Sequence, residues 1–538
     1  MCRSSRSSRN ASNRSVGLEG APTLQSTSFG SDTRSADVAQ RRIYHPPLPL
    51  SSPCRSLPST LAMSIPLSLW ALLALGISAR AAPSSSDDAS DLVSVAWYTG
   101  WHAEDYPPSN VSWSKYSLLH YAFAVTVDSP NELSLEESDE SLLPEFVKTA
   151  HENGVKAGLS IGGWTGSRFF STNFGSSDNR TAFVKTVTNL ANQYNLDALD
   201  FDWEFPGLQG MGCNTISPDD VDHFTSFLNE LRQTDAGSKL LLTAATSIMP
   251  YHDSTGNIST NLTAWAEPLD YVALMNYDVF GPATSPFLDD VTGKTPHVAG
   301  PSAPLADVCA PQDSFKRGSA TSGTAAWMSA GVPANKILLG VPSYAHSFEV
   351  KDVGDNLTTF YPEIDQERNK NKTAGDAWDP PDAPSGVNVC GDIGGPGGSL
   401  QYWGLIQQGY LSENGTAARS DLEYKWDGCS QSPFIYDASK QLLISYEDQR
   451  SIALKGNFIH DQGLAGFAMW EAGGDKDDQL LDAITSAAKN GNSTINTDDG
   501  TPKAASGAAS TSDSNSALRL SLSPVLMLAG SLTLMTVA

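Results

Sequence analysis

The chain has 538 residues, of which 40% are hydrophobic and 17% are charged, as in an ordinary globular protein long enough for two or three domains. Its 60 acidic residues against 34 basic ones give a formal charge of −26, which excludes nucleic acid and other polyanions as expected partners. A neutral substrate such as a sugar meets no such electrostatic penalty, so the charge permits it without indicating it.

The N-terminal 81 residues predict a leader and not a folded domain. Residues 1–62 are rich in Ser and Arg, poor in acids and aromatics and without periodicity, so we expect them to be disordered or not translated. The apolar run of residues 65–77, followed by Ala79-Arg80-Ala81, indicates a secretory signal peptide over residues 63–81, with Met63 as the start. The alternative is an organelle transit peptide within residues 1–62, but such peptides are not followed by an apolar run.

Short runs of apolar and β-branched residues recur between Ala82 and about Asn490, with helical spacing between several of them. Eight such runs cover residues 92–98, 118–125, 155–161, 198–203, 240–246, 271–275, 337–341 and 464–470. Helical spacing is clearest over residues 183–194 and 221–231. Alternation of strand with helix predicts a parallel sheet, and eight units predict an α/β fold, a (β/α)8 TIM barrel over residues 82–490.

The gap between the seventh and eighth runs is too long for one helix. It predicts a small α+β insertion subdomain between strands 7 and 8, at about residues 348–455. Runs over residues 434–436 and 442–445 favour an antiparallel sheet accompanied by a helix.

Four cysteines follow the leader: Cys213, Cys309, Cys390 and Cys429. In a secreted protein this even number predicts two disulfides, for which three pairings exist. We favour Cys213–Cys309 and Cys390–Cys429, because each pair then lies within one structural region. The spacing does not match a metal site, so we expect no metal and no cofactor. Sequons fit a glycosylated surface and lie at Asn110, Asn179, Asn257, Asn261, Asn356, Asn371, Asn414 and Asn492.

The C-terminus predicts a lipid anchor. A Ser/Ala-rich linker over residues 491–519 precedes an uncharged apolar tail, residues 520–538, which is the pattern of a GPI signal. Attachment fits Ser506-Gly507-Ala508, with Asn515-Ser516-Ala517 as a competing site, and a plain membrane anchor is the alternative. We therefore expect a secreted, monomeric protein at the cell surface or wall, which contacts the membrane only through its lipid.

The fourth predicted strand carries three acids. Asp200, Asp202 and Glu204 occupy every second position, so they share one face at a spacing of roughly 6 to 7 Å. Like charges under partial burial raise the pKa of at least one of them, which can then donate a proton near neutrality. A calcium loop would need Gly where Asp202 stands, and a solvated charged edge does not fit a buried strand. Asp197 has the other parity, so we expect it to face away in a structural hydrogen bond.

Other strand ends are also polar or aromatic. Trp97-Tyr98, Ser160 to Trp164, Met275 to Asp278 and Met469 to Glu471 end the first, third, sixth and eighth strands. In a TIM barrel these ends form the active site. Indole rings stack on the C–H face of a sugar while carboxylates and phenols bind its hydroxyls, so these residues predict a carbohydrate site.

Over about residues 92–475 the sequence resembles glycoside hydrolase family 18, the retaining chitinases. Its signature Asp-x-x-Asp-x-Asp-x-Glu is matched by Asp197, Asp200, Asp202 and Glu204. Further motifs are matched by Ser160-x-Gly162-Gly163, Met275-x-Tyr277-Asp278 and Trp470.

The resemblance implies roles for these residues. Glu204 is implied as general acid and base, with the substrate's own 2-acetamido oxygen as the nucleophile. Asp202 would orient the acetamido group, Asp200 would exchange a proton with Asp202, and Tyr277 would donate its hydroxyl to the acetamido oxygen. The implied substrate contacts are Tyr98, Gly163, Trp164, Met275, Asp278, Tyr344 and Trp470, with Trp470 under the sugar before the scissile bond and Trp164 on the leaving-group side. Many relatives carry Arg where this chain has His346, which leaves the contacts there open.

The implied activity is endo-hydrolysis of β-1,4 bonds in chitin and chito-oligosaccharides with retention. The alternatives are a chitin-binding lectin of the same fold and an endo-β-N-acetylglucosaminidase that acts on N-glycans. Glu204 favours the enzyme over the lectin, because inactive relatives commonly lose that acid. The insertion would deepen one wall of a cleft and favours a polymer over the N-glycan core.

Overall fold

The computed structural model describes residues 92–281, 297–354, 357–365, 368, 375–379, 389–391 and 397–491. The predicted leader, signal peptide and tail lie outside the described residues, as do the linker beyond Gly491 and the sequons at Asn356, Asn371 and Asn492. Within these described ranges, we find no helix with the length and apolar character needed to cross a membrane.

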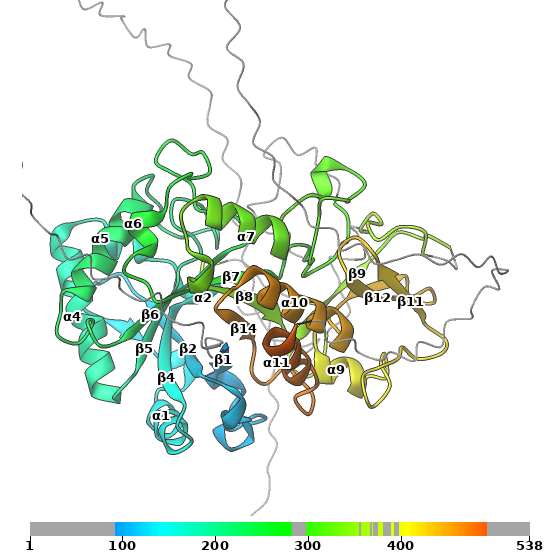
Figure 1. Cartoon of the computed structure of the whole chain (residues 1–538), viewed down its shortest axis with the longest axis horizontal. Coiled ribbons are helices and arrows are strands. Elements are labelled where there is room, and N and C mark those ends of the chain that lie inside the picture. Colours follow the sequence, from blue (N-terminus) through cyan, green and yellow to red (C-terminus); the bar gives the residue numbers. More distant parts are fainter. Residues whose placement is uncertain are drawn as a thin grey trace, which may run out of the picture. The chain divides into compact units, whose positions relative to one another are not determined.

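Parallel strands close into a barrel (Figure 1). The eight strands follow the order β1-β14-β8-β7-β6-β5-β4-β2, and β2 pairs back to β1. They are β1 (Val93–Thr99), β2 (Leu118–Thr126), β4 (Lys156–Gly162), β5 (Ala198–Asp202), β6 (Leu241–Ser247), β7 (Tyr271–Met275), β8 (Ile337–Pro342) and β14 (Gly466–Trp470). A short strand, β3 (Leu133–Ser134), pairs with β2 in antiparallel fashion. The predicted (β/α)8 barrel is confirmed, strand by strand.

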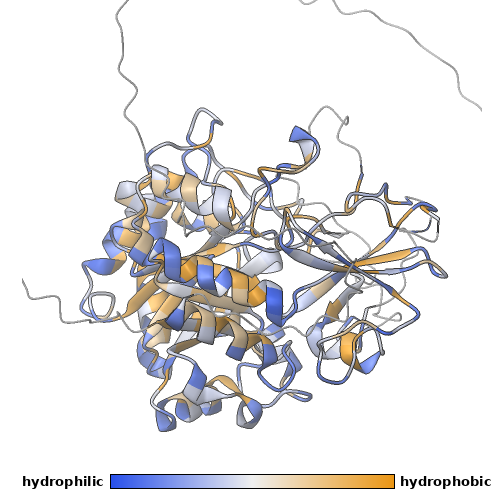
Figure 2. Ribbon diagram, turned by 45° about the vertical axis from the view of Figure 1, so that its right-hand side comes forward, coloured by the Kyte–Doolittle hydropathy of each residue, from blue (hydrophilic) through white to orange (hydrophobic). Residues whose placement is uncertain are grey.

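Helices follow most of the strands. They are α1 (Leu143–Glu152), α2 (Gly163–Gly166), α3 (Phe170–Phe174), α4 (Ser177–Tyr194), α5 (Asp220–Arg232), α6 (Thr263–Ala266), α7 (Ala320–Ser329), α10 (Gln449–Gln462) and α11 (Gln479–Asn490). The two stretches with helical spacing became α4 and α5. Ser176 caps α4 by accepting the N–H of Asn179, and Asn195 ends it in the left-handed conformation. Figure 2 shows apolar residues concentrated on the barrel strands and polar stretches on the helices.

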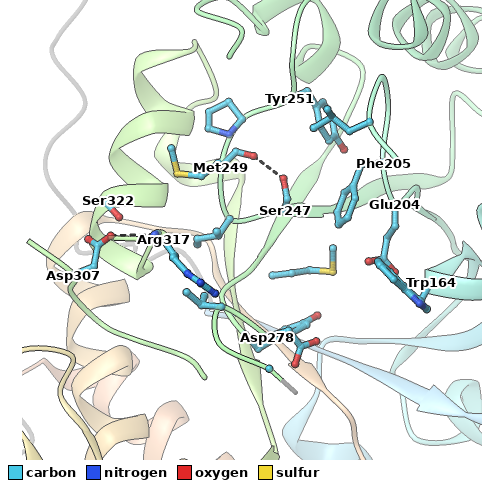
Figure 3. A pocket seen from close by; sticks show the side chains of 18 of the residues that line it. Trp164, Glu204, Phe205, Ser247, Met249, Tyr251, Asp278, Asp307, Arg317 and Ser322 are labelled. Atoms are coloured by element: carbon cyan, nitrogen blue, oxygen red, sulfur yellow. Dashed lines mark hydrogen bonds between the residues drawn. The ribbon is translucent and has the colours of Figure 1, made fainter. Parts of the chain in front are cut away.

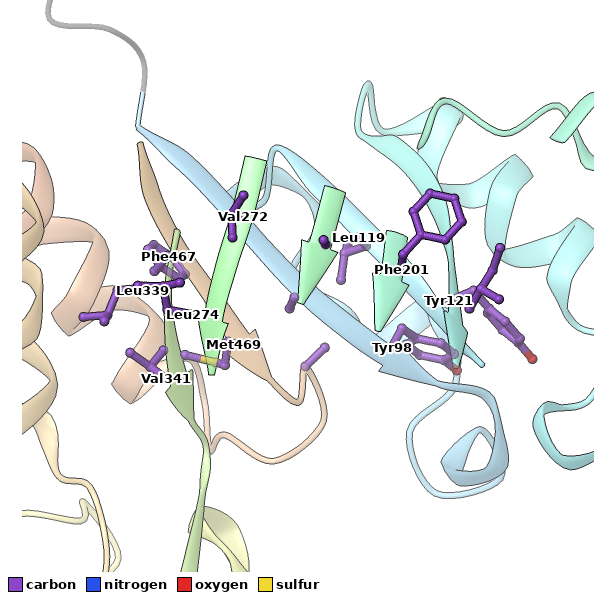
Figure 4. Close-up of a cluster of buried hydrophobic side chains, with 14 of the residues drawn as sticks. Tyr98, Leu119, Tyr121, Phe201, Val272, Leu274, Leu339, Val341, Phe467 and Met469 are labelled. Carbon is purple, nitrogen blue, oxygen red and sulfur yellow. The ribbon is translucent and has the colours of Figure 1, made fainter. Parts of the chain in front are cut away.

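Two apolar layers hold the barrel and position the acids. Alternate strand residues face the helices, and Figure 4 shows part of this outer layer, including Phe201 of β5. The intervening residues fill the barrel interior, where Ala198, Ala245 and Ala468 are small. Because Phe201 faces the helices, Asp200 and Asp202 share the interior face with Ala198, as strand parity predicted.

A second, antiparallel sheet lies between β8 and β14 in the sequence. Its strand order is β10-β9-β13-β12-β11. The elements are β9 (Tyr344–Glu349), β10 (Ser399–Gln401), α9 (Tyr402–Gln407), β11 (Glu423–Asp427), β12 (Ser432–Asp437) and β13 (Leu442–Ser445). Phe348 and Phe434 pack with Phe280 of the loop that follows β7. The expected α+β insertion between the seventh and eighth strands is therefore present.

The disulfide pairing differs from the prediction. The bonds are Cys213–Cys390 and Cys309–Cys429, with Cα–Cα distances of 5.4 and 5.7 Å. Cys213 follows β5 and Cys309 follows β7, so each bridge joins a barrel loop to the insertion. The pairing by region was wrong because the loops at the carboxyl ends of β5 and β7 reach the insertion: Leu305 N, for example, donates to Ser430 O at 2.8 Å.

Candidate active site

The three acids Asp200, Asp202 and Glu204, here called the acid row, continue past the end of β5. Asp200 and Asp202 are 1% and 5% exposed, and Glu204 lies two residues beyond the strand, partly buried at a cleft. Ser167 fixes the backbone here, because its hydroxyl lies 3.0 Å from the Asp202 carbonyl oxygen and accepts the N–H of Glu204 at 2.9 Å. Asn214 Nδ2 donates to the Glu204 carbonyl oxygen at 3.0 Å. These contacts set the direction in which the third acid leaves the strand.

Asp200 forms the base of the row and is held by uncharged donors. Its Oδ2 accepts Trp97 Nε1 at 3.0 Å and Ser160 Oγ at 2.7 Å, and its Oδ1 accepts Thr243 Oγ1 at 2.6 Å. His120 lies 3.3 Å from Thr243 Oγ1, and burial lowers its pKa, so the imidazole is neutral. Three hydrogen bonds from β1, β4 and β6 therefore fix this carboxylate in the barrel interior.

Two of the three acids, Asp202 and Glu204, have raised pKa values. Burial, followed by the charge of Asp200, raises the pKa of Asp202 well above its usual value. Among the described residues its Oδ1 has no hydrogen-bond partner. Burial, then the charges of Asp202 and Asp278, raises the pKa of Glu204 in the same way. The row can therefore supply a proton where an ordinary carboxylic acid is ionised.

A second group of residues follows β7 and faces the row. Burial and the charge of Asp202 raise the pKa of Tyr277, so its phenol remains a hydrogen-bond donor. Asp278 Oδ1 accepts Tyr344 OH at 2.7 Å and lies 2.5 Å from His346 Nε2. Desolvation would raise the pKa of Asp278, but the hydrogen bond and charge of His346 outweigh it and lower the pKa. Since the Asp278 side chain is 54% exposed, it still offers an acceptor to a ligand.

A cleft of about 650 Å³ opens over these residues. Trp164, Glu204, Met275, Tyr277 and Asp278 all line it, together with Met249, Pro250 and Ile258 of the loop after β6. Figure 3 shows Trp164, Glu204 and Phe205 on one side of the cavity and Asp307, Arg317 and Ser322 on the other. The insertion completes the wall with His346, Gly397 and Ser399.

Aromatic rings occupy the opposite half of the barrel mouth. Trp470, at the end of β14, stacks on Phe123 with ring centroids 5.5 Å apart at 14°. Trp101, which is 43% exposed, continues the stack at 6.0 Å from Phe123. Trp97 links this half to the acids, because it lies 6.0 Å from Trp470 and bonds Asp200. The acid row therefore lies between the stacked rings of Trp101, Phe123 and Trp470 and the cleft beside Trp164.

Two of the predicted substrate contacts, Tyr98 and Gly163, have other roles in the structure. Tyr98 is 1% exposed, donates to the Tyr106 carbonyl oxygen at 2.8 Å and packs on Phe146, so it belongs to the helix-facing core and does not wall the site. Strand parity explains this, since Trp97 takes the interior position. Gly163, at φ +77°, lies so close to the Phe123 ring that a Cβ would meet it at 2.7 Å; it sets the shape of the site.

Asp197 behaves as its parity predicted. Its Oδ2 accepts the N–H of Ala157 at 2.9 Å and lies 2.8 Å from His151 Nε2, at the other end of β5 from the cleft. Its contacts are structural.

Sequence reasoning missed Trp97, Thr243 and Ser167 as supports of the acids. The sequence did point to Trp97, because it stands next to Tyr98 at a strand end. The two side chains face opposite sides of the strand, and the wrong one was assigned to the barrel interior. Thr243 and Ser167 had none, since the register between strands and the path of a loop are set by tertiary packing.

Comparisons with known proteins agree with this geometry. The model of the glycosyl hydrolases family 18 matches residues 93–475. A chitinase-like effector of Moniliophthora roreri is 44% identical over 411 residues, which are 75% of this chain and 95% of that protein. A chitinase-like effector of Moniliophthora perniciosa is 40% identical over 75% of this chain and 89% of that protein. The crystal structure of a chitinase from Rhizomucor miehei has a TM-score of 0.63 at 29% identity, and covers 74% of this chain and 100% of that one.

The family match extends from the first barrel strand past the last one and includes the acid row, the residues after β7 and Trp470. This match supports chitin hydrolysis in general. The chain belongs to glycosyl hydrolases family 18.

Proposed function

We propose that this protein hydrolyses β-1,4 bonds in chitin and chito-oligosaccharides with retention, by substrate-assisted catalysis. The observation that carries the proposal is the position of Glu204, an acid with a raised pKa at the cleft, next in line to the buried Asp202. Family membership and the likeness to the Rhizomucor miehei chitinase support the choice of substrate.

In the first step Glu204 gives its proton to the glycosidic oxygen as the bond to the anomeric carbon breaks. The acetamido oxygen of the same sugar attacks that carbon and forms a cyclic oxazolinium ion, so no enzyme nucleophile is needed. Asp202 accepts the acetamido N–H and stabilises the positive ring, while the Tyr277 hydroxyl donates to the acetamido oxygen and aligns it. Trp470 supports the sugar ring from below.

In the second step Glu204, now ionised, takes a proton from a water molecule whose oxygen attacks the anomeric carbon. The oxazolinium ring opens, the acetamido group is restored and the configuration is retained. Asp200 keeps its place through its three donors and shares the proton of Asp202, so that the row never carries its full charge at once.

The Glu204→Gln variant tests the proposal. Hydrolysis of chito-oligosaccharides should fall by at least about 1,000-fold, because the amide cannot deliver a proton, while the affinity measured by calorimetry stays close to that of the wild type. The control is Glu152→Gln, since Glu152 is an exposed acid that pairs with Lys148 on α1. Unchanged turnover in Glu204→Gln removes this residue from the mechanism, and cleavage of cellulose oligomers, which lack the acetamido group, refutes substrate assistance.

The second candidate is oligosaccharide binding with little turnover. It is favoured by the two relatives named chitinase-like effectors, at 44% and 40% identity. Tight binding of chito-oligosaccharides by the wild type, without products over hours of incubation, would establish it. An endo-β-N-acetylglucosaminidase acting on N-glycans is the third candidate; release of N-glycans from a glycoprotein, without chitin cleavage, would favour it.

We further propose that the protein is secreted, monomeric and held at the cell surface by a GPI anchor. The signal-like run after Met63 supports secretion, and the apolar C-terminal tail supports the anchor. Release of the protein from cells by a phosphatidylinositol-specific phospholipase tests the anchor.

A further inference from the structure

Residues 375–379 of the insertion connect the barrel to one wall of the cleft, and the mechanism above does not use them. Trp378 stacks on His102 of the loop after β1, with ring centroids 3.8 Å apart at an interplanar angle of 13°. The Trp378 Nε1 also donates to Asp105 Oδ2, in the same barrel loop, at 3.0 Å. Through this one side chain the insertion is attached to the barrel.

His102 is fixed in turn by the end of β14. Its Nδ1 lies 2.9 Å from Oε1 of Glu471, which is 2% exposed and directly follows Trp470. The Ser343 hydroxyl donates to the Glu471 carbonyl oxygen at 2.7 Å and accepts the Glu471 N–H at 2.9 Å. The ring of Trp378 is therefore attached to the strand end that carries the proposed support of the sugar.

Asp379, the next residue, holds the part of the insertion that lines the cleft. Its carboxyl group accepts four backbone N–H groups, those of Gly397 and Gly398 at 2.6 Å and those of Gly375 and Ser399 at 3.0 Å. Gly397 and Ser399 line the cleft. Four donors on one carboxyl group leave this wall little freedom to move relative to Asp379.

Glu204 is positioned without these contacts. Its N–H donates to Ser167 Oγ at 2.9 Å and its carbonyl oxygen accepts Asn214 Nδ2 at 3.0 Å, and both partners belong to barrel loops. A shift of the insertion's wall would therefore change the space that holds an oligosaccharide and leave the proton donor in place. Such a change weakens the ground state and the transition state alike, so it raises KM and leaves kcat nearly unchanged.

We propose that His102, Trp378 and Asp379, here called the bracket, are positioning residues that fix the insertion's wall of the cleft to the barrel. The bracket thereby determines how tightly the cleft binds an oligosaccharide. The inference rests on the proposed function for the identity of the ligand, but the attachment of the wall exists without substrate.

Steady-state kinetics on a chito-oligosaccharide of fixed length test the proposal in His102→Ala and Asp379→Ala. KM should rise about tenfold in each variant, with kcat within about twofold of the wild type. Because both residues act through one attachment, the double variant should exceed the stronger single variant by no more than about twofold. The matched control is Asp437→Ala, since Asp437 is a buried acid of the same insertion that accepts the Ser439 N–H at 3.0 Å in a turn between β12 and β13. An unchanged KM in Asp379→Ala, or independent effects that multiply in the double variant, overturns the proposal; if His102→Ala does not fold, Trp378→Ala takes its place.

Hydrogen exchange of the full-length protein gives an answer that needs neither substrate nor turnover. Loss of the stacked ring in His102→Ala should speed exchange of the amides of residues 397–399, which donate to Asp379, by at least about tenfold. Trp426→Ala is the control, because it removes an aromatic ring of the inserted sheet that stacks under Arg450 at 3.7 Å, and it should leave these amides unchanged. Exchange in His102→Ala equal to that of the wild type overturns the proposal. Absence of both hydrolysis and oligosaccharide binding in the wild type defeats the proposed function, while the exchange rates still decide whether the bracket holds the wall.

Discussion

Asp200, Asp202 and Glu204 are carboxyl groups on one strand face, yet their surroundings give them different tasks. Asp200 accepts three hydrogen bonds from uncharged donors and is held in place. Asp202 has one oxygen without a partner among the described residues, and burial raises its pKa. Glu204 faces the cleft with a raised pKa. At the scale of single residues, unequal hydrogen bonding and burial separate the firmly held carboxyl group of Asp200 from the two acids whose pKa is raised.

Trp97→Phe should lower kcat/KM by roughly tenfold to a hundredfold, because Asp200 loses a hydrogen bond to a charged group worth about 1.5–3 kcal/mol. The matched control is Trp113→Phe. Trp113 is also buried and donates its indole N–H, at 2.9 Å, to the Pro108 carbonyl oxygen, away from the acids. It should cost comparable stability but leave kcat/KM unchanged. Equal losses of activity in the two variants would show that Trp97 acts only through packing.

At the scale of elements, the loops after β5 and β7 determine how the barrel and the insertion cooperate. The insertion supplies His346 to the cleft wall, and both disulfides tie it to these loops. The Asp379 carboxylate orders the insertion's approach to the cleft by accepting the N–H groups of Gly375, Gly398 and Ser399. The lining of the site therefore comes from both sheets, the barrel and the sheet inserted between β8 and β14.

Loss of one partner of a buried ion pair at α10 should destabilise the protein strongly. Lys455 Nζ lies 2.6 Å from Glu447 Oε2, and the two side chains are 0% and 2% exposed. Lys455→Met leaves Glu447 with an uncompensated buried charge, so the free energy of unfolding should fall by about 3–5 kcal/mol. Denaturant titration measures this loss.

The control for that experiment is the exposed pair Lys148–Glu152 on α1, at 2.7 Å and with side chains 69% and 59% exposed. Lys148→Met should cost no more than about 0.5 kcal/mol. Adding Glu447→Leu to Lys455→Met should restore much of the lost stability, because the buried charge is then gone. A Lys455→Met variant as stable as Lys148→Met would contradict the expectation.

At the scale of the whole molecule, the raised pKa of Glu204 lowers stability at higher pH. Between the ordinary pKa of glutamate and its raised value in the fold, the native state holds a proton that the unfolded state has lost. The free energy of unfolding therefore falls as the pH rises through this window, by at most about 1.4 kcal/mol per unit from this group. Above the raised pKa the contribution stays constant.

Glu204→Gln removes this ionisation, so the variant should gain stability over the wild type as the pH increases from about 4. Below that pH the two proteins should unfold alike, since the protonated acid and the amide are then both neutral. Thermal unfolding of both proteins across this range measures the difference. A difference that is independent of pH would show that Glu204 titrates normally in the native protein.

Local patterns were sufficient to predict much of the architecture and of the acid row. Runs such as residues 198–203 and 271–275 became β5 and β7, and the alternation of Asp200, Phe201 and Asp202 predicted which side chains face the interior. Such features have a period of two along a strand, so the sequence contains them. The long gap before the last strand likewise indicated the insertion.

The sequence by itself determined the barrel, its inserted sheet and the face that the acids share, because each depends on residues close together in the chain. Only the tertiary structure decided the disulfide partners, the hydrogen bond from Trp97 to Asp200 and the pairing of His346 with Asp278. Those contacts join segments separated by 177, 103 and 68 residues. Closure of the barrel and packing of its loops bring such segments together, and no local periodicity encodes which loop meets which.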